Sequence, residues 1–230
     1  MIFEDQPPLR RLLVIGTPLL TGILLLFHPI PDQAAMEHAE HSGVMDVFAL
    51  LAPIANAFLL VHVLFAPLLA LLGLAVVALL NGVRGVAATI SHVSAFVFVV
   101  SYIVYESIIG TATGLLVRGG AALPLEEQAA ISDAVNRIMR DPVLGDGPSA
   151  LFLIATLSWP MAVITAGFAL RRAGKPLLPC ILLGLSSVFT FHASPLGPLG
   201  MLLFLFAAVN FERAGSAVMG SQEFETMPST

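Results

Sequence analysis

Long hydrophobic runs separated by short polar stretches dominate the chain. The runs cover residues of about 12–28, 47–80, 88–117, 150–170, 176–193 and 200–211. A helix needs about 20 mostly apolar residues to cross the hydrocarbon core of a bilayer, and most of these runs approach or exceed that length. The pattern predicts an all-α, multi-pass transmembrane helix bundle of about six spans, forming one domain over residues 1–213.

Some of these ranges leave alternatives open. The run at 12–28 follows a basic pair, as a signal peptide would, but it is long for a signal core and more spans follow, so we expect it to be retained. The runs at 176–193 and 200–211 are short and are joined by a turn rich in proline and glycine. They either cross fully or form a re-entrant hairpin. The small, polar residues 214–230 are expected to form a disordered tail.

The polar segment 118–148 predicts one further helix. Two glutamates follow Pro124 in the first turn, and Arg137 and Arg140 stand in the last, so the charges suit the helix dipole. Apolar residues at helical spacing give this segment one hydrophobic side. We expect an amphipathic helix on the membrane surface or over the ends of the bundle, either as a packing element or as a lid.

Composition supports a membrane protein and argues against a nucleic-acid partner. Of the 230 residues 57% are hydrophobic and 11% are charged, whereas soluble domains carry about 25% charged residues. The net charge of -5 is the wrong sign for binding nucleic acid. Cys180 is the only cysteine, so the chain forms no internal disulfide.

The basic residues predict the orientation of the bundle. Cytoplasmic loops carry an excess of lysine and arginine. With six spans, most of the basic residues fall on the side of the two termini: Arg10, Arg11, Arg84, Arg171, Arg172, Lys175 and Arg213. Both termini are therefore expected in the cytoplasm, and the polar segment after the first span is expected outside.

That outer segment, residues 27–46, is rich in metal-type ligands. It contains His28, His38, His41, Glu37, Glu40, Met36 and Met45, and topology adds His192 at the outer end of the fifth run. Imidazole and carboxylate suit zinc, iron and copper(II), and thioether suits copper(I). The sequence predicts a bound transition metal or b-type haem on this face, with copper as the first choice and zinc as another. The alternative is that these histidines sit at the lipid–water boundary because they are amphipathic.

A second candidate site lies within the predicted spans. Glu106 is the only carboxylate inside a span, where an acid costs on the order of 2.5–3.5 kcal/mol on insertion scales. Tyr102 and His92 share its helix face, although His92 is about 21 Å away along the axis. His62 in the second span is deep enough to meet Glu106. The group predicts proton relay, ion binding or a metal ligand set, or else a buried hydrogen bond without further function.

Three classes of function follow from these patterns. The first is a metal-binding or redox module at the outer histidines. The second is a transporter or channel that uses Glu106, and the third is an accessory or scaffold subunit with a membrane-protein partner or a second copy of itself. Nucleotide-binding, serine-hydrolase and covalent-haem motifs are absent from the sequence. A membrane-embedded metal hydrolase remains a further alternative, with no nucleophile identified.

Overall fold

The computed structural model describes residues 7–30, 46–193 and 195–225, and the side chains of this part up to residue 214. Every regular element in this part is helical, which confirms the expected fold class. In chain order the elements are α1 Pro7–Arg11, η1 Leu12–Gly16, α2 Thr17–Leu26, α4 Val47–Leu51, η2 Ala52–Ile54, α5 Ala55–Leu79, α6 Val86–Glu106, η3 Ser107–Ala112, α7 Thr113–Gly120, α8 Leu125–Met139, α9 Ala150–Arg172, α10 Leu177–Leu185, η4 Ser186–Thr190 and α11 Leu196–Glu225.

Five helical segments of the described part are long and apolar enough to cross a membrane. They are Pro8–Leu26, Val47–Leu79, Val86–Gly120, Ala150–Arg172 and Leu196–Ala214. The fifth predicted span corresponds to a shorter apolar helix, Leu177–Thr190. Helix α11 continues to Glu225, into the segment where a disordered tail was expected. Proline is absent between residues 199 and 227, so nothing in that stretch forces the backbone out of a helix.

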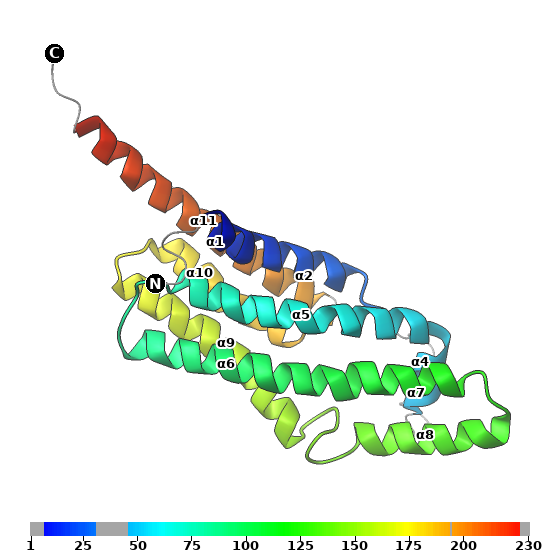
Figure 1. The fold of residues 1–230 in the computed structure, drawn as a ribbon. Helices are drawn as coiled ribbons and strands as arrows, with labels where there is room; N and C mark the ends of the chain where they lie inside the picture. The colour runs from blue at the N-terminus through cyan, green and yellow to red at the C-terminus, as the bar shows by residue number, and fades with distance from the viewer. Residues whose placement is uncertain (1–6, 31–45, 194, 226–230) are drawn as a thin grey trace.

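The main core lies where α5, α6, α9, α10 and α11 pack together, with α2 against α5 and α11 (Figure 1). Its centre is a layer of fully buried aromatic rings, in which Phe98 packs on Trp159 and Trp159 packs on Phe189 and Phe204. Trp159 Nε1 donates a hydrogen bond to the carbonyl oxygen of Ser186 at 3.1 Å. This bond holds η4 against α9, and thereby fixes the segment that leads to the turn after it.

The ends of α5 and α7 beyond this core form a second, smaller core with α4 and α8. Its buried residues are Phe48, Leu51, Ala55, Phe58, Val117 and Val135. The predicted helix of the 118–148 segment is confirmed as α8, which lies alongside α7 (Figure 1). Asp46 caps α4 through its Oδ1, which accepts hydrogen bonds from the backbone N–H of Phe48 and the hydroxyl of Ser132 on α8. One carboxylate thus caps the N-terminus of α4 and also holds α8 against it.

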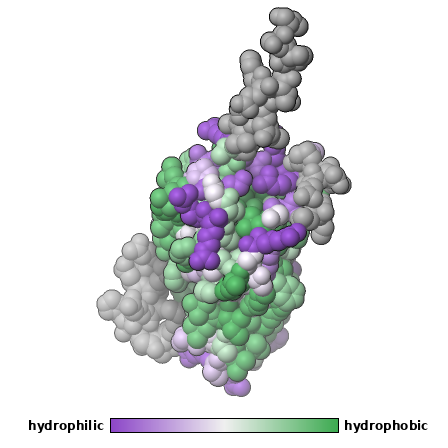
Figure 2. Space-filling model, turned by 90° about the vertical axis from the view of Figure 1, so that its left-hand side faces the viewer, coloured by the Kyte–Doolittle hydropathy of each residue, from purple (hydrophilic) through white to green (hydrophobic). Residues whose placement is uncertain are grey.

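The opposite end of the bundle carries the turns between α5 and α6 and between α9 and α10. Gly174 ends α9 at φ +82°, a left-handed conformation that glycine adopts without strain. Arg10 and Arg11 on the first helix form ion pairs with Glu212 on α11 at 2.5 and 3.3 Å. Figure 2 looks onto this end and shows hydrophilic residues gathered there, with hydrophobic residues over much of the adjoining surface.

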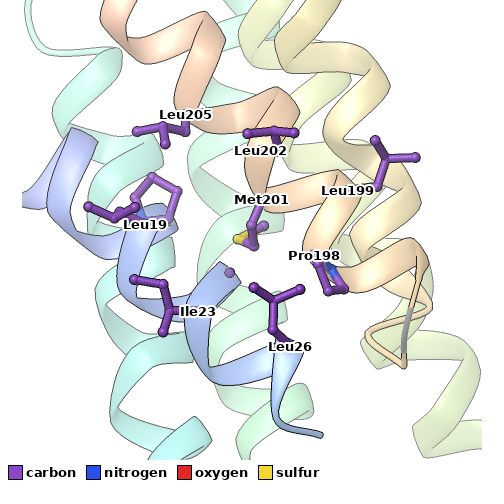
Figure 3. Close-up of a pocket in the computed structure, with 10 residues that line it drawn as sticks. Leu19, Ile23, Leu26, Pro198, Leu199, Met201, Leu202 and Leu205 are labelled. Carbon is purple, nitrogen blue, oxygen red and sulfur yellow. The ribbon is translucent and has the colours of Figure 1, made fainter.

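A hollow of about 260 Å³ lies on the outside of the bundle between α2 and α11 (Figure 3). Its lining consists of Pro18, Leu19, Gly22, Ile23, Leu26, Pro198, Leu199, Met201, Leu202 and Leu205. None of these side chains is titratable or a hydrogen-bond donor. The hollow therefore offers apolar contact and no chemistry.

Candidate metal centre

Four polar side chains from separate parts of the chain meet inside the bundle. His28 follows α2, His62 lies in α5, Glu106 is the last residue of α6, and His192 follows η4. One ring nitrogen from each histidine lies within 4.8 Å of the other two. Glu106 reaches into the same cluster, with Oε2 3.5 Å from Nε2 of His62 and Oε1 3.6 Å from Nε2 of His192. Two residues from each candidate site of the sequence thus lie together: His28 and His192 from the outer one, and His62 and Glu106 from the one within the spans.

The hydrogen bonds of two of the imidazoles leave their Nε2 atoms as acceptors. Nδ1 of His62 lies 2.6 Å from the carbonyl oxygen of Phe58, and Nδ1 of His28 lies 3.1 Å from that of Pro29. A carbonyl accepts only, so each Nδ1 carries the proton and each Nε2 presents a lone pair. Metal-bound histidines generally donate the other ring N–H to an oxygen in this way, which fixes ring orientation and tautomer.

The third imidazole is held through a tyrosine. The hydroxyl of Tyr102 lies 2.8 Å from Nδ1 of His192 and 3.2 Å from the carbonyl oxygen of Thr190. A hydroxyl has one proton to donate, and the carbonyl can only accept, so Tyr102 donates to Thr190 and accepts from His192 Nδ1. The Nε2 of His192 is then also a free acceptor that faces Glu106. All three rings therefore offer a nitrogen lone pair to the same centre.

The spacing of these atoms suits a single ion. Zinc–nitrogen bonds of about 2.0–2.1 Å place the ligands of a tetrahedral ion about 3.3–3.4 Å apart. The separations of 3.5 and 3.6 Å between Glu106 and its two histidines lie close to that value. The three histidine nitrogens lie within 4.8 Å of one another, so binding one ion would draw them closer together. In addition, His28 Nε2 and Glu106 Oε1 are buried without a hydrogen-bond partner. Buried polar atoms are normally satisfied, and an ion at this centre would satisfy both.

Local backbone structure makes room for the cluster. Residues Ser107–Ala112, directly after Glu106, form a π-helix, and π-helical turns occur frequently at functional sites. Gly110 in this turn lies against the imidazole of His62, where a Cβ atom would overlap Cδ2 and Cγ of the ring. Gly197 at the start of α11 lies equally close to the backbone of His192. Gly110 thus lets the π-helical turn approach His62, and Gly197 allows the tight turn between His192 and α11.

Burial keeps His28 and His192, which follow the ends of helices, in the neutral form. Loss of solvent lowers the pKa of His28, and it lowers the pKa of His192 to about 3, with smaller contributions from the neighbouring histidines. Both side chains are therefore uncharged at pH 7. The neutral imidazole is the form that coordinates a metal.

The cluster opens on one side into a cavity of about 390 Å³. His28, His62, Glu106 and His192 all line it, together with residues of α4, α5, α8 and α9. Tyr105 also lines it and donates a hydrogen bond to Asp146 Oδ1 at 2.6 Å. From the sequence, Tyr105, like Tyr102, was offered only as a hydrogen-bond partner of Glu106, and Asp146 was assigned no role. The position of Tyr105 next to Glu106 was the available signal.

The other side of the cluster is closed by aromatic side chains. Phe65, Tyr102 and Phe189 are fully buried, and the ring of Phe65 lies 5.4 Å from that of His192. Beneath them lies the Phe98–Trp159 pair of the main core. Among the described residues, the cluster is therefore open toward the cavity and is closed by aromatic side chains toward the opposite end of the bundle.

Two helices place the cluster at a similar distance from the turns at the opposite end of the bundle. At 1.5 Å per residue, Glu106 lies about 30 Å along its helix from Val86, and His62 lies about 26 Å from Leu79. A hydrocarbon core is about 30 Å thick. If the turns at the opposite end mark one membrane boundary, the cluster and its cavity lie near the other.

The remaining candidates of the sequence are not among the described residues of the cluster. Six of them, His38, His41, Glu37, Glu40, Met36 and Met45, belong to residues 31–45, outside the described part of the chain. His92 is partly buried on α6, far along the helix from Glu106, and takes no part in the cluster. Comparisons with protein-family models, curated proteins and solved structures find no match for this chain.

Proposed function

We propose that this chain is an integral membrane metalloprotein that holds one divalent transition-metal ion, with zinc as the first choice. The ligands are Nε2 of His28, His62 and His192 and the carboxylate of Glu106. The observation that carries the proposal is the cluster of three histidine ring nitrogens within 4.8 Å of one another, with the buried carboxylate of Glu106 beside two of them.

The choice of metal follows from the ligand set. Three nitrogens and one carboxylate oxygen suit zinc or iron, and the described cluster contains no thiolate that would favour copper(I). The sequence had favoured copper because of Met36 and Met45, which lie outside the described residues. A b-type haem fits poorly, because Glu106 and the third histidine occupy the space that a macrocycle between two axial imidazoles would need.

Transport through the bundle is the less favoured function. A path for ions or protons past Glu106 would need to continue toward the opposite end. The fully buried rings of Phe65, Tyr102 and Phe189 lie in that direction. A centre that is reached from one side fits a bound cofactor better than a conduction route.

Metal analysis of the untagged protein, purified in mild detergent, tests the proposal. We expect about one zinc per chain, either as purified or after incubation with zinc and removal of excess. The His62→Ala and Glu106→Gln variants should lose at least nine-tenths of that metal. The matched control is His92→Ala, which removes a histidine from α6 outside the cluster and should keep it.

Two outcomes would overturn the assignment. One is a wild-type protein that stays free of metal even with zinc supplied. The other is a His62→Ala variant that is folded and holds as much metal as the His92→Ala control.

A further inference from the structure

The cavity beside the metal centre has features of a ligand site that metal binding alone does not require. We propose that it binds an acyl amphiphile, with the carbonyl oxygen of the ligand on the metal and a hydroxyl or amide N–H of the head group donated to Asp146. This inference rests on the proposed function, because the carbonyl needs an ion to bind.

The first step of the argument is access to the ion. All four proposed ligand residues line the cavity, so an ion among them is exposed to it. Four protein ligands are typical of closed structural zinc sites, but zinc can expand to five ligands, and here the carbonyl oxygen would be the fifth. An ion that borders a cavity on one side can add that ligand from the cavity.

The second step is the chemistry of the wall. Leu51, Phe58, Ile109, Met139 and Phe152 are among the apolar lining residues. The volume of about 390 Å³ falls within the range of about 300–1,000 Å³ that is typical of small-molecule sites. The cavity has apolar walls and is expected near a membrane boundary. Such a site suits the acyl chain of a molecule that partitions into lipid.

The third step is the polar group on the cavity wall. Asp146 lines the cavity, and its Oδ1 accepts hydrogen bonds from the hydroxyl of Tyr105 at 2.6 Å and from the backbone N–H of Gly147 at 3.0 Å. These bonds hold the carboxylate in place. A carboxylate accepts hydrogen bonds, so it selects a head group that has a donor.

Cobalt-substituted protein in lipid nanodiscs provides the test, because cobalt(II) absorbs visible light and detergent cannot compete for the cavity. The probes are acetohydroxamic acid and octanohydroxamic acid. Both would bind the metal through the carbonyl and hydroxyl oxygens, with release of the hydroxyl proton to solvent, and keep an N–H for Asp146, but they differ in chain length. Both should change the cobalt spectrum. Octanohydroxamic acid should bind at least a hundredfold more tightly, because each buried methylene contributes roughly fourfold.

Asp146→Asn tests the head-group contact. It should keep the cobalt spectrum of the free protein and weaken octanohydroxamic acid at least tenfold, as expected for a hydrogen bond to a charged group. Asp133→Asn is the matched control, since Asp133 lies on the exposed face of α8, with 60% of its side chain accessible. That variant should bind the probe as the wild type does.

The outcomes separate this inference from the proposed function. A protein that takes up no cobalt refutes the metal centre itself. Bound cobalt that ignores both probes shows that the ion is closed to the cavity. Equal affinity for the two chain lengths refutes the apolar site, and an unchanged affinity in Asp146→Asn refutes the head-group contact.

Discussion

At the scale of single residues, Glu106 raises the main energetic question. Its side chain is almost fully buried, and Oε1 has no hydrogen-bond partner. The tyrosines that the sequence offered as partners are engaged elsewhere, since Tyr102 contacts His192 and Tyr105 contacts Asp146. An ion between Glu106 and the histidines would compensate for the loss of solvent around this carboxylate.

Tyr102→Phe tests the tyrosine as a positioning residue. Without the hydroxyl, Nδ1 of His192 loses its acceptor, and the ring is free to change tautomer and orientation. Loss of such an outer contact typically weakens metal binding by about 10- to 100-fold. We expect a loss of this size in zinc affinity, measured by competition with a chromogenic chelator.

Tyr105→Phe is the control for this experiment. It removes a neighbouring hydroxyl that contacts Asp146 and no proposed ligand. Zinc affinity should stay within about twofold of the wild type. Equal losses in the two tyrosine variants would contradict a specific role for Tyr102.

Gly110→Ala tests whether metal binding depends on the space that Gly110 leaves for the imidazole of His62. The added Cβ would overlap the imidazole of His62, so the ring must move away from Glu106. We expect the zinc content per chain to fall by more than half although no ligand is changed. Gly119→Ala is the control, because no atom lies within 4 Å of its added Cβ. Full occupancy in Gly110→Ala would show that the ring tolerates the shift.

At the scale of elements, a polar network joins α8 to α4. Asp46 Oδ1 accepts from Ser132 at 2.8 Å, and Asn136 Oδ1 accepts from the backbone N–H of Val47 at 3.1 Å. Val135 adds an apolar contact in the second core. Together these contacts place Met139 at the end of α8 on the wall of the cavity.

Asp46→Ala should therefore loosen α8 as a unit. Loss of a helix N-cap costs about 1 kcal/mol, and the contact with Ser132 is lost with it. We expect faster hydrogen–deuterium exchange over residues 125–139 and unchanged exchange over α6.

Asp133→Ala is the control for this prediction. It breaks an exposed ion pair with Arg137 at 2.7 Å, a kind of contact worth only about 0.3–0.5 kcal/mol. Exchange over α8 should change little. Equal protection of α8 in Asp46→Ala and wild type would show that apolar packing alone holds the helix.

At the scale of the whole molecule, the basic residues predict which end faces the cytoplasm. The turn after α9 carries Arg171, Arg172 and Lys175, and the positive-inside rule predicts that this end lies inside. We then expect the proposed metal centre and its cavity toward the outside. In a Cys180→Ser background, Ala122→Cys should react with an impermeant maleimide added to intact cells.

Ala173→Cys provides the comparison. It lies in the turn at the opposite end and should react only after the cells are broken open. Labelling of Ala173→Cys alone in intact cells would reverse the predicted orientation and place the centre toward the cytoplasm.

The sequence alone determined the class of the fold, because long apolar runs leave a chain in lipid no alternative to helices that satisfy their own backbone hydrogen bonds. It also indicated α8, through charge placement and periodicity, and singled out His28, His62, Glu106 and His192 as candidates. These properties are local, and local patterns are visible in a sequence.

Only the tertiary structure decided that these four residues belong to one cluster. They come from four segments far apart along the chain. Their meeting depends on where η4 ends against α9, on the close approach at Gly110 and on the tight turn at Gly197. The sequence had placed His62 and Glu106 deep in the membrane, apart from His28 and His192 at its outer face. The helix of Val86–Gly120 is longer than a single crossing requires, so depth could not be read from residue numbers, and packing between helices set it.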